Sequence, residues 1–549
     1  MSRSVTVVLA AAVMFLCLAG GVKALECIDP IDTEQGQIMG KADQEVAACY
    51  WKGIPFAEPP VGDLRWRAPS PPAEREYVLE AFEFGPRCIS GGAGSGVSAD
   101  KLPEASEDCL YLNVWRPQKS GVFPVMVWIH GGSLSVGTAA EPIYWGERLS
   151  AWQDVVVVSI NYRLNYFGFM AHPGLAEEDE HNSAGNYGLL DQVAALQWVK
   201  NNIEGFGGDP ENVTIFGESA GGWSVCNLLA SPLAEGLFEK AILESGGCDV
   251  VLSMETGFKH GELFADDLGC ADTADPVSCM RAIDPTEMDI LLAAGAKERK
   301  KAKKKNKEDK SLMDMVGDFK WVPHIDGWAM PDVPIELIRS GDFNQVPFMV
   351  GSNRDEIKLL AIVPGIRLAP RWLVNKGYKG VVGEESLDKV KDLYPYRDYR
   401  RPADAAMDAF GHMALGCKCW EAAEAVSEYG PVYYYRFDYD QHLAPHMVGA
   451  AHGVEIPFIF GNLDKPPARW LLTKRQTKKA TELSDMMMEY WSNFARTGDP
   501  NAEDLPEWPT YDKEGRQRMY LDLPIKVAPT TNVEQCEFWR ERDISLTGE

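Results

Sequence analysis

The stretch from Asn212 to Gly222 (Asn-Val-Thr-Ile-Phe-Gly-Glu-Ser-Ala-Gly-Gly) constrains the fold more than any other part of this chain. The apolar run from Val213 to Phe216 indicates a buried strand, and the run from Trp223 to Ala230 suits a helix. Between them lies Gly217-x-Ser219-x-Gly221, whose glycines leave room for a serine on a strained turn. An ordinary turn could carry the same five residues, but the strand before it and the helix after it favour a nucleophile.

Backbone donors for a developing oxyanion are predicted at two places. The helix after Ser219 directs its first amide groups toward that residue, so the N–H of Ala220 is one candidate. A second strand, Pro124 to Ile129, ends in His130-Gly131-Gly132-Ser133. Glycines directly after a buried strand leave N–H groups free to approach a ligand, as in the oxyanion hole of α/β-hydrolases. We interpret His130 as structural because it precedes the nucleophile and lies in this glycine motif.

Strands and helices alternate through much of the chain. The valine run from Asp154 to Asn161 suits a central strand that is covered on both faces. A helical spacing follows at Leu189 to Val199, and further strands are predicted at three segments, Lys240–Ser245, 346–351 and Val432–Phe437. The pattern predicts an α/β fold with a large, mostly parallel central sheet flanked by helices.

No internal repeat, long linker or Pro-rich spacer divides the chain, so we expect residues 25–549 to form one domain with long insertions between sheet strands. One such insertion contains the run from Lys297 to Lys310, in which nine of fourteen residues are basic. We interpret this run as a solvated loop rather than a binding patch because no aromatic residue interrupts it.

Residues 1–24 have the features of a signal peptide. Arg3 gives a basic start, Val5 to Leu18 form an apolar segment, and Val22-Lys23-Ala24 offers small residues at a cleavage site. The apolar segment is too short to span a bilayer, and no later stretch reaches the roughly 20 apolar residues that a spanning helix needs. We therefore expect a secreted, extracellular protein that begins near Leu25 and has no transmembrane segment.

Charge and cysteine content exclude several classes of function. The chain has 54 Lys and Arg against 81 Asp and Glu, a net charge of −27, so nucleic acid is not an expected partner. Twelve cysteines in an exported protein indicate disulfides rather than a metal site. There is no Cys-x-x-Cys or His-Glu-x-x-His motif, and Cys417-Lys418-Cys419 has the wrong spacing. We expect neither a metal nor a cofactor.

A serine nucleophile needs a histidine to accept its proton and a carboxylate to orient that histidine. The histidines in the required chain order are His412, His442, His446 and His452. His452 lies in a Gly-Ala-Ala-His-Gly turn from which a ring can project, although position alone leaves a structural role equally open. For the acid, Asp355 and Glu356 are adjacent after a predicted strand, and the residues themselves do not distinguish them.

The chain resembles the type B carboxylesterases, the family that also contains the cholinesterases, over essentially its whole mature length. The resemblance is carried by motifs at residues 53–57, 107–113, 130–132, 161–164, 217–222, 353–356 and 452–455, which read GIPFA, EDCLYLN, HGG, NYRL, GESAGG, NRDE and HGVE. Together these motifs are highly specific.

The resemblance implies a role for each matching residue. The nucleophile is Ser219, the acid is Glu356 and the base is His452. The oxyanion donors are Gly131, Gly132 and Ala220. The family has an acidic residue beside the nucleophile, here Glu218, and a second serine that supports the triad through hydrogen bonds, here Ser245.

The resemblance also implies disulfides, which pair Cys88 with Cys109, Cys270 with Cys279 and, as in some family members, Cys417 with Cys536. Cys27 and Cys49 are a plausible fourth pair by position only. The expectation for Cys226, Cys248 and Cys419 is that they are buried thiols.

Two departures from the cholinesterases bear on the substrate. Residues 89–108 contain no aromatic side chain where cholinesterases carry a tryptophan, and Gly247-Cys248-Asp249 replaces an acyl-side tryptophan. The expected function is thus hydrolysis of neutral carboxylic esters, of small molecules or lipids, through an acyl-enzyme intermediate. A lipase, a cholinesterase-type enzyme and a non-catalytic adhesion relative are the alternatives. The acyl-chain length and the oligomeric state are not predicted.

Overall fold

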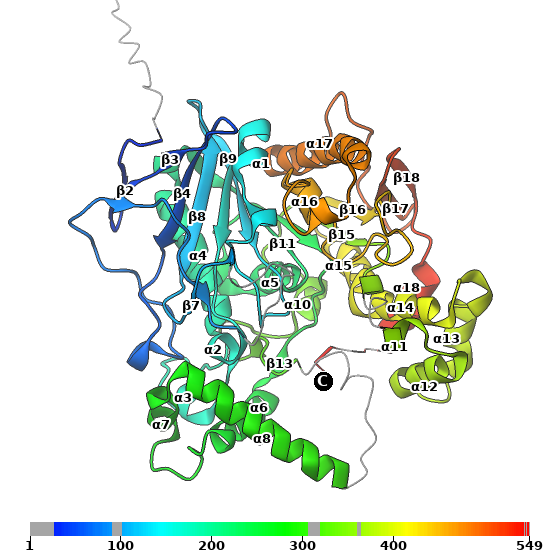
Figure 1. The fold of residues 1–549 in the computed structure, drawn as a ribbon, viewed down its shortest axis with the longest axis horizontal. Coiled ribbons are helices and arrows are strands. Elements are labelled where there is room, and N and C mark those ends of the chain that lie inside the picture. The colour runs from blue at the N-terminus through cyan, green and yellow to red at the C-terminus, as the bar shows by residue number, and fades with distance from the viewer. Residues whose placement is uncertain are drawn as a thin grey trace, which may run out of the picture.

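An eleven-stranded sheet runs through the centre of the protein (Figure 1). The structure is a computed structural model, and it describes residues 27–90, 101–305, 319–359, 364–542, 544 and 546–547. The strand order is β18-β17-β16-β15-β12-β11-β9-β10-β8-β4-β3. In chain order these strands are β3 (Lys41–Ala42), β4 (Ala48–Pro55), β8 (Tyr111–Pro117), β9 (Phe123–Ile129), β10 (Val156–Ile160), β11 (Gly208–Glu218), β12 (Lys240–Glu244), β15 (Phe348–Asn353), β16 (Val432–Phe437), β17 (Gln517–Leu521) and β18 (Lys526–Pro529).

The middle of this sheet is parallel and its edges are antiparallel. Every neighbouring pair from β10 through β9, β11, β12, β15 and β16 to β17 is parallel. Antiparallel pairs join β8 to β10 and β4, β3 to β4, and β18 to β17. The predicted α/β class with a mostly parallel sheet is confirmed, and the prediction for β16 matches its bounds.

Helices cover both faces of the sheet, which explains why its central strands are apolar throughout. In β9, Val125, Val127 and Ile129 face one core, while Met126 and Trp128 face the other. The first core is covered by α4 (Tyr187–Asn202), α5 (Ala220–Ala230), α10 (Pro334–Ser340) and α15 (Cys417–Val426). The second is covered by α1 (Glu147–Gln153), α16 (Ile456–Ile459) and α17 (Lys474–Thr497).

Long insertions carry the remaining elements. The helices are α2 (Asn165–Phe169), α3 (Pro173–Glu177), α6 (Met254–Asp267), α7 (Pro276–Ala282), α8 (Pro285–Lys305), α11 (Pro364–Arg367), α12 (Arg371–Val382), α13 (Leu387–Leu393), α14 (Pro402–Gly411), which continues into a π-helical segment (His412–Gly416), and α18 (Val533–Arg540). Short strands pair as β1 (Ile31–Thr33) with β2 (Gly36–Met39) and β2 with β5 (Leu79–Glu80), β6 (Arg87–Cys88) with β7 (Ala105–Ser106), and β13 (Leu252–Ser253) with β14 (His324–Ile325).

The basic run from Lys297 to Lys310 is not a loop where the structure describes it. Helix α8 continues to Lys305, and the end of the run lies outside the described residues. Lysine, alanine and glutamate are all good helix formers, so the composition of this run favours the continuation of α8 once a helix has begun. The prediction considered charge and overlooked this propensity.

The predicted disulfides are present, and a fifth was missed. The structure joins Cys27 to Cys49, Cys88 to Cys109, Cys270 to Cys279 and Cys417 to Cys536. Cys226 and Cys248 also form a disulfide, so the prediction of thiols at these two positions was wrong. The reason is a close approach of backbones: a Cβ on Gly222 would lie 3.1 Å from the Cα of Gly246, which brings the next turn of α5 beside Cys248. Cys419 is a buried free thiol, as expected.

The central sheet takes its first strand from Lys41–Ala42 and its last from Lys526–Pro529. One domain over residues 25–549 stays a prediction. The predicted signal peptide, residues 1–24, lies outside the described residues. Within the described ranges, no helix combines the length and the apolar character needed to cross a membrane.

The disulfide pattern leads to a prediction about thiols. Without reductant, we expect alkylation of the denatured mature chain to modify Cys419 only, because every other cysteine after Leu25 is paired. Under native conditions Cys419 should resist alkylation, since it is fully buried. Peptide mass spectrometry checks both statements, and an alkylated Cys226 or Cys248 in the unreduced protein would contradict the fifth pairing.

Candidate active site

Ser219 occupies a strained turn between β11 and α5. Its backbone has φ 60° and ψ −122°, a conformation that residues other than glycine rarely adopt. Its N–H donates to the Glu244 carbonyl at the end of β12 (2.9 Å). A Cβ on Gly221 would lie 2.0 Å from the Ile129 carbonyl oxygen, so only glycine fits where the turn passes β9. The turn therefore has the geometry that the sequence predicts for a nucleophile.

The predicted oxyanion donors lie on both sides of Ser219. Ala220 is the first residue of α5, and Gly131 and Gly132 follow β9. A Cβ on Gly131 would lie 3.0 Å from the Cβ of Ser219, which places this glycine against the nucleophile. Gly132 has φ 114°, and a Cβ there would lie 2.2 Å from the Val136 carbonyl oxygen. Gly131 and Ala220 therefore flank Ser219, and Gly132 follows Gly131 in the same loop.

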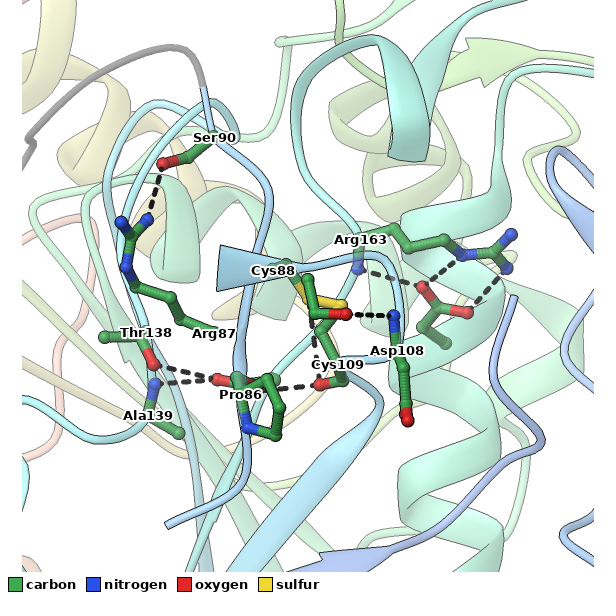
Figure 2. The surroundings of a disulfide bond; sticks show 12 residues. Pro86, Arg87, Cys88, Ser90, Asp108, Cys109, Thr138, Ala139 and Arg163 are labelled. Carbon is green, nitrogen blue, oxygen red and sulfur yellow. Dashed lines mark hydrogen bonds and ion pairs between the residues drawn. A yellow bond between two sulfur atoms is a disulfide. The ribbon is translucent and has the colours of Figure 1, made fainter. Parts of the chain in front are cut away.

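The Asn161 side chain, directly after β10, holds the loop that follows these glycines. Its Oδ1 accepts from the Ala139 N–H (2.9 Å) and from the Thr138 hydroxyl (3.2 Å). Its Nδ2 donates to the carbonyls of Pro86 (3.0 Å) and Cys109 (3.2 Å). Figure 2 shows Thr138, Ala139 and Pro86 beside the disulfide of Cys88 and Cys109. One amide therefore ties the loop to the Cys88–Cys109 disulfide region.

His130 has the structural role that the sequence predicts. Its buried ring stacks on Tyr162 with centroids 4.6 Å apart, and Nδ1 donates to the Gly131 carbonyl (2.8 Å). Burial lowers the pKa of His130 to about 4, against the opposite effect of the bond to Gly131. The Tyr162 hydroxyl donates to the His130 carbonyl (2.8 Å). The ring is neutral at pH 7 and braces the glycine loop.

The two adjacent carboxylates after β15 have different partners. Glu356 Oε1 accepts from the Asn353 N–H (2.7 Å), and Glu356 Oε2 accepts from His452 Nδ1 (2.8 Å). The His452 N–H also donates to the Glu356 carbonyl (3.1 Å). Asp355 instead forms ion pairs with Arg354 and Lys358, both 2.8 Å long. Geometry therefore selects Glu356 as the carboxylate that orients His452, a choice that the residues alone left open.

The other ring nitrogen of His452 lies beside Glu218. Nε2 is 3.2 Å from Glu218 Oε1, whereas among the described residues Ser219 Oγ makes no hydrogen bond. Catalytic hydrogen bonds are often long or misaligned in a free enzyme and tighten when substrate binds. His452 thus lies between two glutamates, Glu356 on Nδ1 and Glu218 on Nε2.

This arrangement couples the protonation of His452 to that of Glu218. Burial acts to lower the pKa of His452, but the charges of Glu218, Glu356 and Glu455 raise it to about 10. Burial raises the pKa of Glu218 to about 7, which the charge on His452 partly offsets and Glu356 reinforces. In the free protein the imidazolium form is stabilised by the surrounding carboxylates.

Two further buried glutamates were not assigned a role from the sequence. Asn353 Nδ2 donates to Glu455, and burial together with the charges of Glu218 and Glu356 raises the Glu455 pKa. Glu244 accepts from Trp491 Nε1 (2.7 Å), and burial raises its pKa to about 8. Position offers a signal for both, since Glu455 closes the HGVE motif and Glu244 ends a buried strand.

Ser245 is placed near the turn but does not form the hydrogen bond that the resemblance implies. It is fully buried, has φ 47° and donates its N–H to the Gly351 carbonyl (2.8 Å). Within the described ranges its Oγ has no hydrogen-bond partner. The left-handed backbone at Ser245 and its bond to β15 fix the residue, while the hydroxyl remains unused in this geometry.

The region where a cholinesterase would bind its cation is only partly described, because residues 91–100 lie outside the described ranges. On the acyl side, Asp249 forms an ion pair with Lys418 (2.6 Å), so its charge is compensated. Phe319 packs edge-to-face on Trp223 of α5, with centroids 5.6 Å apart.

Trp321 lines a cavity of about 340 Å³ between α6 and α8. Within the described ranges, no His, Cys, Asp and Glu cluster could hold a metal ion.

Comparison with known proteins gives a consistent result. The model of the carboxylesterase family matches residues 29–539. Para-nitrobenzyl esterase of Bacillus subtilis (strain 168) is 36% identical over 504 residues, covering 90% of this chain and 95% of that protein. Liver carboxylesterase of Sus scrofa is 36% identical over 556 residues, covering 93% and 92%. A solved structure of a PNB esterase superposes with a TM-score of 0.79 at 34% identity, covering 94% of this chain and all of that one. The chain therefore belongs to the carboxylesterase family of carboxylic ester hydrolases.

Proposed function

We propose that this protein is a secreted serine carboxylesterase that hydrolyses neutral carboxylic esters through an acyl-enzyme intermediate. The observation that carries the proposal is the 2.8 Å hydrogen bond from His452 Nδ1 to Glu356 Oε2 beside the strained turn of Ser219. That bond fixes the tautomer in which Nε2 can accept a proton, and it stabilises the imidazolium that forms.

In the first half of the reaction, Ser219 Oγ attacks the ester carbonyl carbon and His452 Nε2 takes the hydroxyl proton. The carbonyl oxygen becomes an oxyanion, which accepts hydrogen bonds from the N–H groups of Gly131, Gly132 and Ala220. Collapse of the tetrahedral intermediate breaks the bond to the alcohol oxygen, and His452 returns the proton to that oxygen. The acid remains attached to Ser219 as an ester.

In the second half, water replaces the alcohol. His452 Nε2 takes a proton from the water as its oxygen attacks the acyl carbon, and the same backbone donors stabilise the second tetrahedral intermediate. As the bond between the acyl carbon and Ser219 Oγ breaks, His452 Nε2 returns the proton to Oγ, which releases the carboxylic acid and restores the hydroxyl. Each proton moves between the His452 ring and an oxygen of Ser219, the alcohol or water, so Glu356 keeps its charge throughout.

The preference for neutral esters rests on what surrounds the acyl and alcohol sides. Residues 89–108 contain no aromatic residue to hold a quaternary ammonium, and the Asp249 carboxylate is already paired with Lys418. Relatives named for para-nitrobenzyl esters and as liver carboxylesterases support the same assignment. Export is part of the proposal because residues 1–24 resemble a signal peptide and five disulfides suit an oxidising compartment.

Replacement of the nucleophile tests the proposal directly. Ser219→Ala should lower kcat for p-nitrophenyl acetate by at least about 10⁴-fold, since no other group can carry the acyl chain. The thermal midpoint should change little because the substitution removes one hydroxyl that makes no hydrogen bond within the described ranges. Ser245→Ala is the matched control and should retain most activity. Substantial turnover by Ser219→Ala would refute the assignment, as would an organophosphate adduct on another residue.

The pH dependence of the reaction should report on Glu218. The base must be neutral, so kcat/KM rises as pH passes the His452 pKa, and carboxylates that raise this pKa move the acid limb upward. Glu218→Gln removes the strongest of these charges and should shift the acid limb to lower pH by about one unit or more. Glu239→Gln, a half-buried glutamate remote from His452, is the control. If the acid limb of Glu218→Gln stayed at the pH of the unmodified enzyme, the protonation of His452 would not depend on Glu218.

Substrate choice gives a third test. We expect kcat/KM for neutral aryl or alkyl esters of short to medium acids to exceed that for acetylthiocholine by at least about tenfold, equivalent to about 1.4 kcal/mol of transition-state binding. The physical reason is the missing aromatic face, which would otherwise offset the desolvation of a permanent cation. The measurement is kcat/KM for a series of p-nitrophenyl esters and thiocholine esters on one preparation. Equal kcat/KM values for the two classes would reveal an unrecognised cation site.

A further inference from the structure

Helix α12 and the turn before it expose three large apolar side chains. Leu368 is 70% exposed, Trp372 is 68% exposed and Leu373 is 41% exposed. We call these residues the α12 patch. A single exposed leucine needs no explanation, but three large apolar side chains exposed within six residues of the chain mark a candidate interaction site.

The exposure of the patch does not come from a loosely attached helix. The opposite face of α12 is buried through Val374, Tyr378 and Val382, which recur at helical spacing. The ring of Tyr378 lies 5.9 Å from that of Phe410 in α14. The helix thus has one apolar stripe toward the protein and a second apolar group toward solvent.

Basic residues surround the patch. Residues 364–382 contain Arg367, Arg371, Lys376 and Lys379 but no aspartate or glutamate, although the chain has a net charge of −27. Arg371, Lys376 and Lys379 are exposed. Arg371 lies over the ring of Tyr396 (5.5 Å), and Lys379 also pairs with Glu384, which lies beyond the helix. The segment is therefore a local basic region on a strongly acidic protein.

We propose that the α12 patch docks the enzyme on the surface of an anionic lipid layer. Exposed Trp and Leu beside Lys and Arg are the combination that holds a helix in the plane of a lipid interface, where the apolar side chains enter the headgroup region. Anionic headgroups attract the basic residues of this segment, of which Lys379 is paired with Glu384. Because the segment is basic, we expect it to bind an anionic lipid surface in preference to a neutral one.

Helix α12 lies close to the carboxylate that orients His452. Figure 1 shows α12 and α13 at one edge of the molecule, beside α14. At the end of α14, a Cβ on Gly411 would lie 3.3 Å from the Cβ of Glu356, so one helix separates the patch from the acid that orients His452. Docking through α12 would therefore bring the active site close to esters dissolved in the lipid layer, a consequence that rests on the proposed esterase function.

Flotation with vesicles tests the docking without relying on catalysis. The full mature protein and its Ser219→Ala variant are mixed with vesicles of phosphatidylcholine alone or of phosphatidylcholine with 30% phosphatidylglycerol, at about physiological salt. We expect both proteins to float with the anionic vesicles and to remain with the solution when phosphatidylglycerol is absent. Trp372→Ala should lower the partition coefficient by about threefold or more, because it removes the largest apolar side chain that enters the interface.

Two further variants separate the contributions. Trp152→Ala is the matched control, because Trp152 in α1 is 50% exposed but lies outside the patch. It should bind like the unmodified protein. The double variant Lys376→Gln, Lys379→Gln should lose about tenfold in binding to anionic vesicles, less than the roughly 30-fold expected for two unpaired juxtamembrane charges because Lys379 is paired with Glu384. Trp372→Ala, Trp152→Ala and the double lysine variant should all keep unchanged kcat/KM for soluble p-nitrophenyl acetate, whereas Ser219→Ala serves only in the binding measurement.

Several results would overturn the docking. These are equal binding to neutral and anionic vesicles, binding unaffected by Trp372→Ala, or an equal loss in Trp152→Ala. An oligomer that dissociates in Trp372→Ala without any change in vesicle binding would assign the patch to self-association instead. Hydrolysis of soluble esters without flotation would refute the docking alone, whereas flotation without hydrolysis would refute the esterase function alone.

Discussion

The positive charge that His452 can carry favours the burial of two carboxylates beside it, those of Glu356 and Glu218. Glu218, Glu356 and Glu455 are each less than 5% exposed, and an isolated buried carboxylate would be strongly destabilising. The imidazole compensates Glu356 through a hydrogen bond and Glu218 through an ion pair, while Asn353 donates to Glu455. The group that accepts the proton during catalysis is thus also the counter-charge of its own surroundings, which links the chemistry of the site to its stability.

The position of Ser219 depends on three neighbouring strands. β9 supplies the glycine loop, β11 leads into the turn, and the last residue of β12 accepts the Ser219 N–H. The strained backbone persists because close contacts on each side leave it no room to relax, as at Gly221 against Ile129. In parallel sheets the carboxyl ends of strands meet along one edge, so His452 and Glu356 need only the loops after β15 and β16 to reach the serine.

Much of this arrangement follows from the sequence, since strands buried on both faces have an unmistakable apolar pattern and the serine lies between strand and helix. The choice between Asp355 and Glu356 does not, because it depends on which carboxylate meets Arg354 and Lys358. The Cys226–Cys248 disulfide depends on the contact between Gly222 and Gly246, which no spacing reveals. The burial of Glu244 and Glu455 is likewise a result of packing, since glutamate is usually exposed.

The overall charge of the protein and the charge of α12 act over different distances. At physiological salt, electrostatic interactions decay over roughly 8 Å, so a lipid surface in contact with α12 interacts with the charges of that helix and of the neighbouring Glu384 more than with distant acidic residues. At low salt the decay length grows to about 30 Å, and the net charge of −27 then opposes approach to the same surface. In the docked orientation that we propose, α14 and Glu356 would lie directly behind the contacting face, because α14 is the helix between α12 and Glu356.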